Sequence, residues 1–520
     1  ISRHIEKGLS PLKAAYKGAR EIALPVIAMT VTLAAAYAPI GFTTGLTGQL
    51  FQEFAFTLAS AVIISGVVAL TLSPMMCARI LKGQEDKEDR FALWLEARFT
   101  NLKYWYRARL VSALKARRLG LLTGLLVLGM CAFLYQTAQK ELAPEEDQGL
   151  IYLLSTGPEW TNLDYVNTYV QAYHGLFQEF PEYEASFLIN GAEGASGGFG
   201  GILLTPWDER ERGHTEIIEE VTKTLSDIPG LTVGAFGAPP LPTSGDGFPF
   251  QFVLKSLGNY EELYETAVAL QSKADQSGNF IFTNLSLNFE KPEIKVTVDR
   301  EKANQLGVSM RDIGNTLATL LGGNYVNLFD LGGRSYRVIP QVPRAFRFDE
   351  TLIGGYYVRS ASGGLVPLST FVAVERVTKP NAQTTFQQLN SATISGVLYP
   401  GVSMGGALAF MEGAAAELLP PAITTDTSGQ TRQYVQEGSQ LAIIFVFALV
   451  VIYLVLAAQF ESFRDPFIIL VTVPMAAVGA LIPINVLLSV NIYTQIGLIT
   501  LIGLISKHGI LMVDFANVSR

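Results

Sequence analysis

Six long apolar stretches constrain this chain more than any other feature. A helix needs about 20 mostly apolar residues to cross the roughly 30 Å hydrocarbon layer of a bilayer. Of the 520 residues, 49% are hydrophobic and only 16% are charged. We therefore predict an integral membrane protein with six spanning helices. They cover residues 23–40, 54–76, 119–138, 441–458, 466–488 and 494–516.

The distribution of Lys and Arg between the spans predicts the orientation of the chain. Residues 1–21 contain five of these basic residues and residues 79–118 contain eleven, whereas residues 41–50 contain none. Basic loops stay on the cytoplasmic side of a membrane. We expect both chain ends and the loop 81–118 to be cytoplasmic, and the long segment between the third and fourth spans to be external.

The cytoplasmic loop carries a second membrane signal. Trp94, Phe99 and Trp105 recur at helical spacing among Arg98 and Arg109. This pattern favours a basic amphipathic helix that lies on the inner surface of the lipid bilayer. A helix packed on another cytoplasmic protein is the alternative.

The external segment reads as a soluble α+β protein. Strand-like and helix-like patterns alternate along it, and two βαβ halves make one split βαβ, or ferredoxin-like, unit. The predicted fold class is a membrane α-helical bundle plus an external α+β domain built of two such units. The domains are 1–80, 119–139 and 436–520 in the membrane, the loop 81–118, the units 140–244 and 245–287 with 390–435, and an insert at 288–389.

Several functional classes lack their motifs. No P-loop occurs, and the glycine cluster 197–201 precedes a strand rather than the helix that a dinucleotide site requires. The four histidines are scattered, and no Cys or His spacing is typical of a metal site. The net charge is −8, so nucleic acid is not an expected partner. We expect no enzyme activity, no cofactor and no metal.

The last span contains a polar stripe. Thr500, Lys507 and Asp514 are seven residues apart, which places them on nearly the same face of a helix. An amine in the hydrocarbon layer costs at least about 2.5–3.5 kcal/mol, so it should face protein or water. Burial and a nearby carboxylate would make this lysine a tunable proton carrier. A structural ion pair, or a lysine that snorkels to the inner surface, is the alternative.

A glycine-rich loop is predicted between two strands of the first unit. It covers residues 190–201, begins with Asn190 and Gly191, and has Phe199 as its one aromatic side chain. Such a loop is either a mobile wall of a substrate path or a long flexible turn.

Several segments of the sequence resemble a known family. They are 141–149, 306–313, 323–327 and 456–463, together with the last span. Through them the chain resembles the resistance-nodulation-division (RND) efflux permeases, in the branch that exports hydrophobic and amphiphilic compounds from Gram-negative bacteria. The resemblance covers essentially the whole chain and matches its spans to spans five to ten of a twelve-span protein.

The resemblance implies an inner-membrane, proton-driven antiporter of hydrophobic or amphiphilic small molecules. Members of this family work as homotrimers and dock to a periplasmic adaptor and an outer-membrane channel. The external segment would accordingly be periplasmic. Its two split βαβ units resemble pore subdomains, and the insert 288–389 resembles the subdomain that docks to the outer-membrane channel. The proton gradient takes the place of a cofactor.

The resemblance also implies roles for particular residues. Lys507 falls on the family's relay lysine, with Thr500 and Asp514 beside it on the same helix face. Residues 190–201 fall on the switch loop between two drug pockets. The residues expected along the substrate path are Phe187, Asn190, Gly191, Phe199, Ile202 and Leu204, of which Phe187 and Ile202 would face the distal pocket.

Two features depart from the family pattern. Ala192 and Gly194 stand where well-known drug pumps have paired phenylalanines. The family's paired aspartates lie in the fourth span, which would precede Ile1, so we expect a partial sequence that does not pump by itself. The alternatives are the heavy-metal-exporting branch, which the sparse methionines disfavour, and a half-length membrane scaffold that transports nothing.

Overall fold

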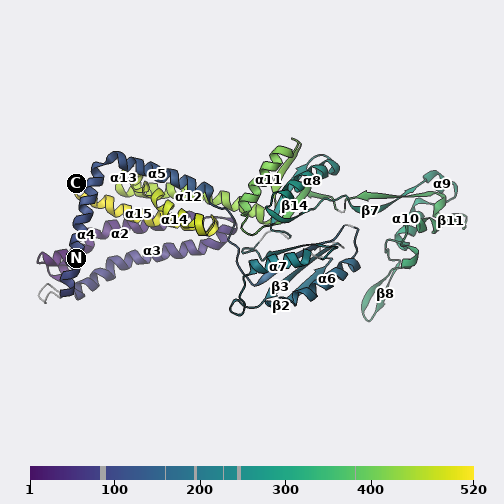
Figure 1. Ribbon diagram of the computed structural model, residues 1–520, viewed down its shortest axis with the longest axis horizontal. Coiled ribbons are helices and arrows are strands. Elements are labelled where there is room, and N and C mark those ends of the chain that lie inside the picture. The colour runs from purple at the N-terminus through teal and green to yellow at the C-terminus, as the bar shows by residue number, and fades with distance from the viewer. Residues whose placement is uncertain are drawn as a thin grey trace.

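The computed structural model describes residues 1–81, 90–158, 160–191, 196–226, 228–242, 247–380 and 382–519. The molecule is elongated, with a helix bundle at one end, two α/β units in the middle and a smaller unit at the other end (Figure 1). Both termini lie at the end of the bundle that is remote from the α/β units. This placement agrees with an even number of membrane crossings.

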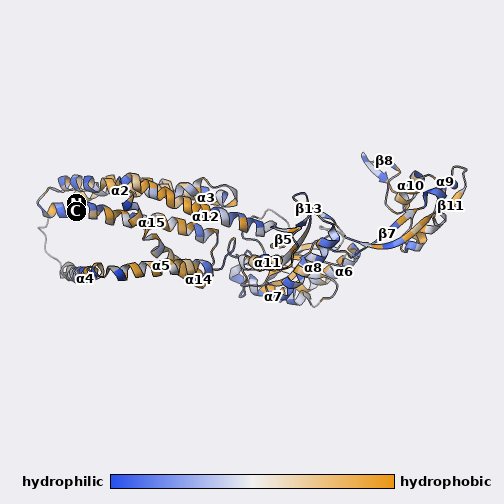
Figure 2. Cartoon of the chain, turned by 90° about the horizontal axis from the view of Figure 1, so that it is seen from above, coloured by the Kyte–Doolittle hydropathy of each residue, from blue (hydrophilic) through white to orange (hydrophobic). Residues whose placement is uncertain are grey.

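All six predicted spans are helical. Within the described residues, six helical segments are long and apolar enough to cross a membrane, and apolar residues line their length (Figure 2). A short helix α1 (Ser2–Glu6) precedes them. The spans are α2 (Pro11–Gly41), α3 (Gly45–Ile80), α5 (Arg117–Thr137), α12 (Gly429–Phe460), α13 (Arg464–Leu470) with α14 (Val473–Leu487), and α15 (Ile492–Ser519).

The fifth span is broken rather than continuous. Helix α13 ends before Val471, and α14 begins at Val473 with Pro474 in its first turn. A proline is tolerated there because the first residues of a helix have no intrahelical partner for their N–H groups. The apolar stretch 466–488 therefore forms two helices instead of one.

Helix α4 (Arg90–Lys115) lies across the end of the bundle that holds the termini (Figure 1). Its side chains Trp94, Phe99 and Trp105 are all exposed. The Arg98 guanidinium lies 5.6 Å from the Trp94 ring centroid, and that of Arg109 lies 6.0 Å from the Trp105 ring. Exposed aromatic rings interleaved with cations suit a membrane interface.

The first α/β unit has the predicted ferredoxin-like topology. Its sheet has the order β2-β3-β1-β4, with every neighbouring pair antiparallel. The strand from one βαβ half lies between the two strands of the other half, as a split βαβ unit requires. Ile151, Phe177 and Ile217 are fully buried between this sheet and the two helices. The elements are β1 (Leu150–Thr156), α6 (Leu163–Phe177), β2 (Tyr183–Asn190), β3 (Gly197–Leu204), α7 (His214–Ser226) and β4 (Thr232–Gly237).

The second α/β unit repeats this order. Strands β6, β14, β5 and β15 pair in that sequence, and β13 (Thr384–Phe386) pairs with the start of β14. Phe250, Phe252 and Leu263 are among its fully buried core residues. The elements are β5 (Phe250–Ser256), α8 (Tyr260–Gln276), β6 (Phe280–Leu285), β14 (Leu389–Leu398), α11 (Met404–Leu418) and β15 (Ile423–Thr427).

The insert extends from the second unit on a two-stranded ribbon. Strands β7 (Lys291–Val298) and β12 (Val372–Lys379) pair along their whole length, and a small core around Ile313, Leu368 and Phe371 lies at their far end. The chain rejoins the sheet at β13, slightly before the predicted boundary at 389. The remaining elements are α9 (Arg300–Gln305), α10 (Met310–Leu320), β8 (Asn327–Leu331), β9 (Arg334–Val338), β10 (Tyr357–Arg359) and β11 (Leu365–Pro367).

Candidate functional site

A run of six aromatic rings joins the two α/β units. It covers the face of the first sheet that faces away from α6 and α7, and ends on β6 of the second unit. Successive ring centroids lie 4.9 to 6.1 Å apart, within the range of favourable aromatic pairs. We call this set the aromatic run; its members, in spatial order, are Phe187, Phe199, Tyr152, Phe236, Phe248 and Phe282.

The aromatic run is exposed at its Phe187 end and buried where the two units meet. Phe187 on β2 is 41% exposed, and Ile189 beside it on the same strand face is 52% exposed. Phe236 and Phe248 are each 7% exposed and pack with Leu154 in one cluster. The structure therefore offers an apolar surface at the Phe187 end that continues into a buried apolar contact between the units.

Two glycines make this arrangement possible. A Cβ atom on Gly201 would lie 2.7 Å from Cε1 of the Phe187 ring, and one on Gly234 would lie 2.0 Å from Cε1 of Phe282. Both distances are shorter than carbon atoms tolerate. Any side chain at Gly201 would displace the open end of the aromatic run, and any side chain at Gly234 would separate the two units.

The prediction of a long glycine-rich loop was wrong in its extent. Residues 197–201 are not a loop but the first part of β3, which pairs with β1 on one side and β2 on the other. Glycine is a poor strand former, so its local propensity predicts a loop for these residues. Pairing with a strand on each side stabilises the strand instead. Only residues 191–196 separate β2 from β3, and residues 192–195 among them lie outside the described part of the chain.

The predicted orientation of Ile202 was also wrong. Ile202 and Leu204 are 2% and 3% exposed and belong to the helix-side core of the first unit. Side chains alternate along a strand, so Phe199, Gly201 and Leu203 occupy the opposite face, where Phe187 lies. Phe187 and Ile202 consequently point to different sides of the sheet.

The turn after β2 is anchored at its base. The Asn190 side-chain amide donates to Oδ1 of Asn167 on α6 at 2.6 Å. Gly191 has a φ of +80°, and its N–H donates to the Gly197 carbonyl at 2.8 Å. A positive φ favours glycine. Ala192 and Gly194 lie outside the described residues.

The polar stripe lies on α15. Lys507 is exposed, whereas Thr500 and Asp514 are half-buried. The Thr500 hydroxyl donates to the Ile496 carbonyl of the same helix at 2.9 Å. Lys507 and Asp514 share a face but are separated by roughly 10 Å along the axis, because each residue adds about 1.5 Å. Within the described part of the chain, neither of them forms an ion pair.

The buried face of α15 fixes where Lys507 points. A Cβ atom on Gly503 would touch Leu33 of α2 at 2.8 Å, and one on Gly509 would touch Ile469 of α13 at 2.7 Å. Helix geometry places Lys507 at the edge of this face. The ammonium group is therefore presented at bilayer depth beside the bundle, where it needs a partner or water.

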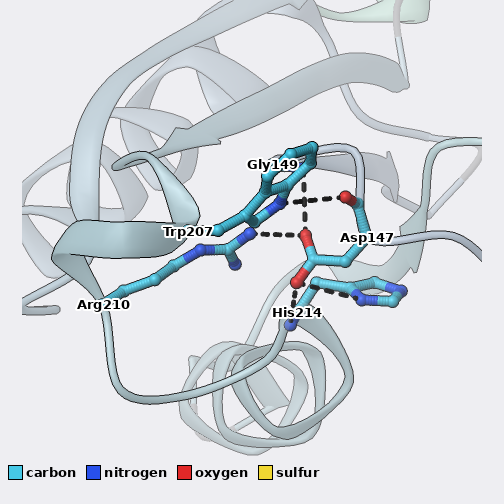
Figure 3. Close-up of polar contacts among 5 residues, drawn as sticks. All are labelled: Asp147, Gly149, Trp207, Arg210 and His214. Atoms are coloured by element: carbon cyan, nitrogen blue, oxygen red, sulfur yellow. Dashed lines mark hydrogen bonds and ion pairs between the residues drawn. The ribbon is translucent and has the colours of Figure 1, made fainter.

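Sequence reasoning missed a polar cluster around Asp147 (Figure 3). One of the carboxylate oxygens of Asp147 accepts from Nη2 of Arg210 at 2.6 Å. The backbone N–H groups of Gly149 and His214 donate to the carboxylate at 3.0 and 2.9 Å, and Trp207 donates from Nε1 to the Asp147 carbonyl. No local pattern identifies partners some 60 residues away.

These contacts change the acidity of Asp147. Partial burial alone would raise the pKa of this carboxyl group. The hydrogen bonds from Arg210, His214 and Gly149 outweigh that effect and lower the pKa to about 2. Asp147 is consequently a fixed negative charge that attaches the segment after α5 to the first unit.

Comparison with known proteins places the chain in a group of transporters. All of residues 1–520 match the family described as the AcrB/AcrD/AcrF family. An uncharacterized transporter of Haemophilus influenzae is 41% identical over 94% of the chain and 47% of its own length. The multidrug resistance protein MdtF of Escherichia coli is 32% identical over 92% of the chain and 47% of its own length. The multidrug/solvent efflux pump membrane transporter MepB of Pseudomonas putida is 30% identical, with the same coverage. The chain thus spans about half the length of these relatives.

Proposed function

Because the chain belongs to the AcrB/AcrD/AcrF family of RND efflux permeases, we propose that the complete protein exports hydrophobic or amphiphilic compounds in exchange for protons. The chain supplies six spans and two pore subdomains of this transporter. In this proposal Lys507 binds and releases the proton, and the aromatic run binds the exported compound.

The observation that carries the proposal is the position of Lys507. It lies well inside α15, whose candidate span covers Ile492–Asn517, and it is exposed on the bundle surface. An unpaired ammonium at this depth is costly, and ionisable groups there mark proton or ion pathways. Loss or gain of one proton at Lys507 would change whether the most stable position of this side chain is in an apolar or a polar environment. Movement of α15 would thereby be coupled to proton binding, as an antiporter requires.

The aromatic run supports the choice of substrate class. Its open end presents Phe187 and Ile189 as exposed apolar side chains. A surface of this kind binds by apolar contact and stacking, and selects for hydrophobic character rather than for particular polar groups. Hydrophobic and amphiphilic compounds fit this surface better than ions or sugars do.

The same proposal includes the assembly. The protein would reside in the inner membrane as a homotrimer, with the α/β units in the periplasm. The insert 288–389 would dock toward an outer-membrane channel with the help of a periplasmic adaptor. Helix α4, with its exposed rings and cations, would lie on the inner surface of the bilayer.

The test is a substitution of Lys507 in the full-length gene. We expect Lys507→Ala to abolish export while the trimer stays intact, because the titrating amine is gone. Lys507→Arg should also fail, since arginine keeps its proton throughout the accessible pH range. His508→Ala, next to it and also exposed, is the matched control and should export normally. Normal export by Lys507→Ala would refute the proposal.

A further inference from the structure

The segment between α5 and β1, residues 138–149, touches three parts of the molecule within a dozen residues. It follows the third span directly and enters the first α/β unit directly. Along the way it pairs with the turn between α14 and α15 and with the start of α11. We call this segment the linker.

Backbone pairing attaches the linker to the membrane bundle. Lys140 and Val490 form a parallel β-bridge. The Val490 N–H donates to the Gln139 carbonyl at 2.8 Å, and the Glu141 N–H donates to the Val490 carbonyl at 3.2 Å. The Ile492 N–H, at the first residue of α15, donates to the Leu142 carbonyl at 3.2 Å. The outer end of the helix that carries Lys507 is thus hydrogen-bonded to the linker.

One side-chain contact reinforces this pairing. The Ser489 hydroxyl donates to the Glu141 carboxylate, and Asn491 donates from its amide to the Ser489 hydroxyl at 2.9 Å. Ser489 and Asn491 are 6% and 3% exposed. Burial raises the pKa of Glu141, and the Ser489 hydrogen bond opposes that shift only in part. Glu141 is the one charged side chain of this contact.

The linker is also attached to both α/β units. The Gly405 N–H in the first turn of α11 donates to the Lys140 carbonyl at 3.0 Å. A Cβ atom on Gly405 would lie 2.9 Å from that carbonyl oxygen, so the approach depends on glycine. At its other end the linker is held by Asp147, whose carboxylate binds Arg210 and the first N–H of α7 at His214.

We propose that the linker transmits movement of α15 to the two pore subdomains, and that Glu141 is the positioning residue that keeps it engaged. This inference rests on the proposed proton-coupled export. A short segment with fixed contacts at both ends moves with whichever partner moves. A tilt of α15 caused by proton exchange at Lys507 would therefore displace the ends of α11 and α7, and with them the two sides of the aromatic run.

The experiment uses the full-length protein in proteoliposomes with a fluorescent hydrophobic cation as substrate. Glu141→Ala should lower the maximal transport rate about fivefold or more, a coupling loss of ordinary size, with the KM for substrate unchanged within about twofold. Glu141→Gln should retain most of the rate, because its amide oxygen still accepts from Ser489. Glu146→Ala, an exposed carboxylate in the same segment, is the matched control and should behave as the unsubstituted protein.

The outcomes separate this inference from the proposed function. A normal rate for Glu141→Ala, in a protein where Lys507→Ala abolishes transport, overturns the linker proposal alone. Equal impairment of Glu141→Gln and Glu141→Ala also overturns it, because ionisation and not the hydrogen bond would then matter. Glu141→Ala could instead lower the transport rate, raise the KM and destabilise the trimer together. That result would show a merely structural role for Glu141 and would reject the proposal. Transport that survives Lys507→Ala would refute the proposed function, on which the linker proposal rests.

Discussion

The two α/β units share one strand order but use the same connection in opposite ways. In the first unit, only residues 191–196 separate β2 from β3, and Asn190 and Gly191 are hydrogen-bonded to Asn167 and Gly197. In the second unit, the equivalent strands β6 and β14 are joined by residues 286–388, which include the ribbon of β7 and β12 and the small core at its far end. Each connection joins an edge strand of its sheet, β2 or β6, to the neighbouring strand, so its length does not interrupt the rest of the sheet.

The comparison shows that two units of one topology differ in the length of a single connection and in what that connection carries. The first unit keeps its connection short, leaves Phe187 exposed, and presents Phe236 and Gly234 to the interface. The second unit contributes Phe282 to that interface and extends its insert away from it. Long insertions add little to the cost of closing a loop, so the second sheet can carry the insert without losing its core.

The largest expected effect comes from removing what distinguishes the second unit. Lys291 and Lys379 are register partners at the base of the ribbon, so residues 291–379 can be replaced by a short Gly-Ser turn. We expect export to be abolished, because the insert that we propose to dock toward an outer-membrane channel is gone, while the second unit stays folded. Its core cluster contains no residue from 291–379. Thermal unfolding and protease resistance of the full-length variant measure this; loss of folded protein would contradict the equivalence of the two units.

A smaller effect is expected at the contact between the units. Gly234→Ala places a methyl group against the Phe282 ring and should lower the free energy of unfolding by about 1–3 kcal/mol. Binding of a hydrophobic fluorescent compound should weaken in parallel. Gly175→Ala is the control: no atom lies within 4 Å of its added Cβ, and alanine in this helix should stabilise by up to about 1 kcal/mol. Equal thermal unfolding midpoints for the two variants would show that the interface is not tightly packed.

The smallest effect concerns the acid that attaches the linker to the first unit. Asp147 has a folded pKa of about 2, below its ordinary value of about 3.9. Its contribution to stability is therefore complete above pH 4 and is lost as the pH falls through 2. Asp147→Asn should destabilise by about 1–2 kcal/mol at pH 7, allowing for its partial exposure, and the difference should shrink toward pH 2.

The control for this substitution is Asp208→Asn, an exposed residue of the same unit. Its unfolding midpoint should match that of the unsubstituted protein at every pH. A pH-independent difference between Asp147→Asn and the unsubstituted protein would mean that the charge of Asp147 contributes nothing, and that its hydrogen bonds act through geometry alone.

The sequence predicts the elements well where a feature is periodic. The six apolar stretches identify the spans, and alternation of strand-like and helix-like segments identifies both split βαβ units, including the interrupted one. Lys507 is noticed because a charge in an apolar stretch is rare. In each case the signal lies within one segment and needs no knowledge of its neighbours.

What the sequence does not reveal depends on partners remote in the chain. The strand character of residues 197–201 comes from pairing with β1 and β2 on both edges, which outweighs glycine's low propensity. The direction of Ile202 follows from that register, so missing the strand also reversed its face. Asp147 finds Arg210 only in the folded unit, and the contact of Glu141 with Ser489 joins positions separated by 348 residues.

The most direct test of proton coupling is the stoichiometric movement of protons and substrate in proteoliposomes that contain the full-length protein. With an inward-acid gradient, addition of a hydrophobic substrate should accelerate proton release from the vesicles, and Lys507→Ala should reduce that acceleration to the rate of empty liposomes. Substrate-dependent proton release that persists in Lys507→Ala would contradict the central claim.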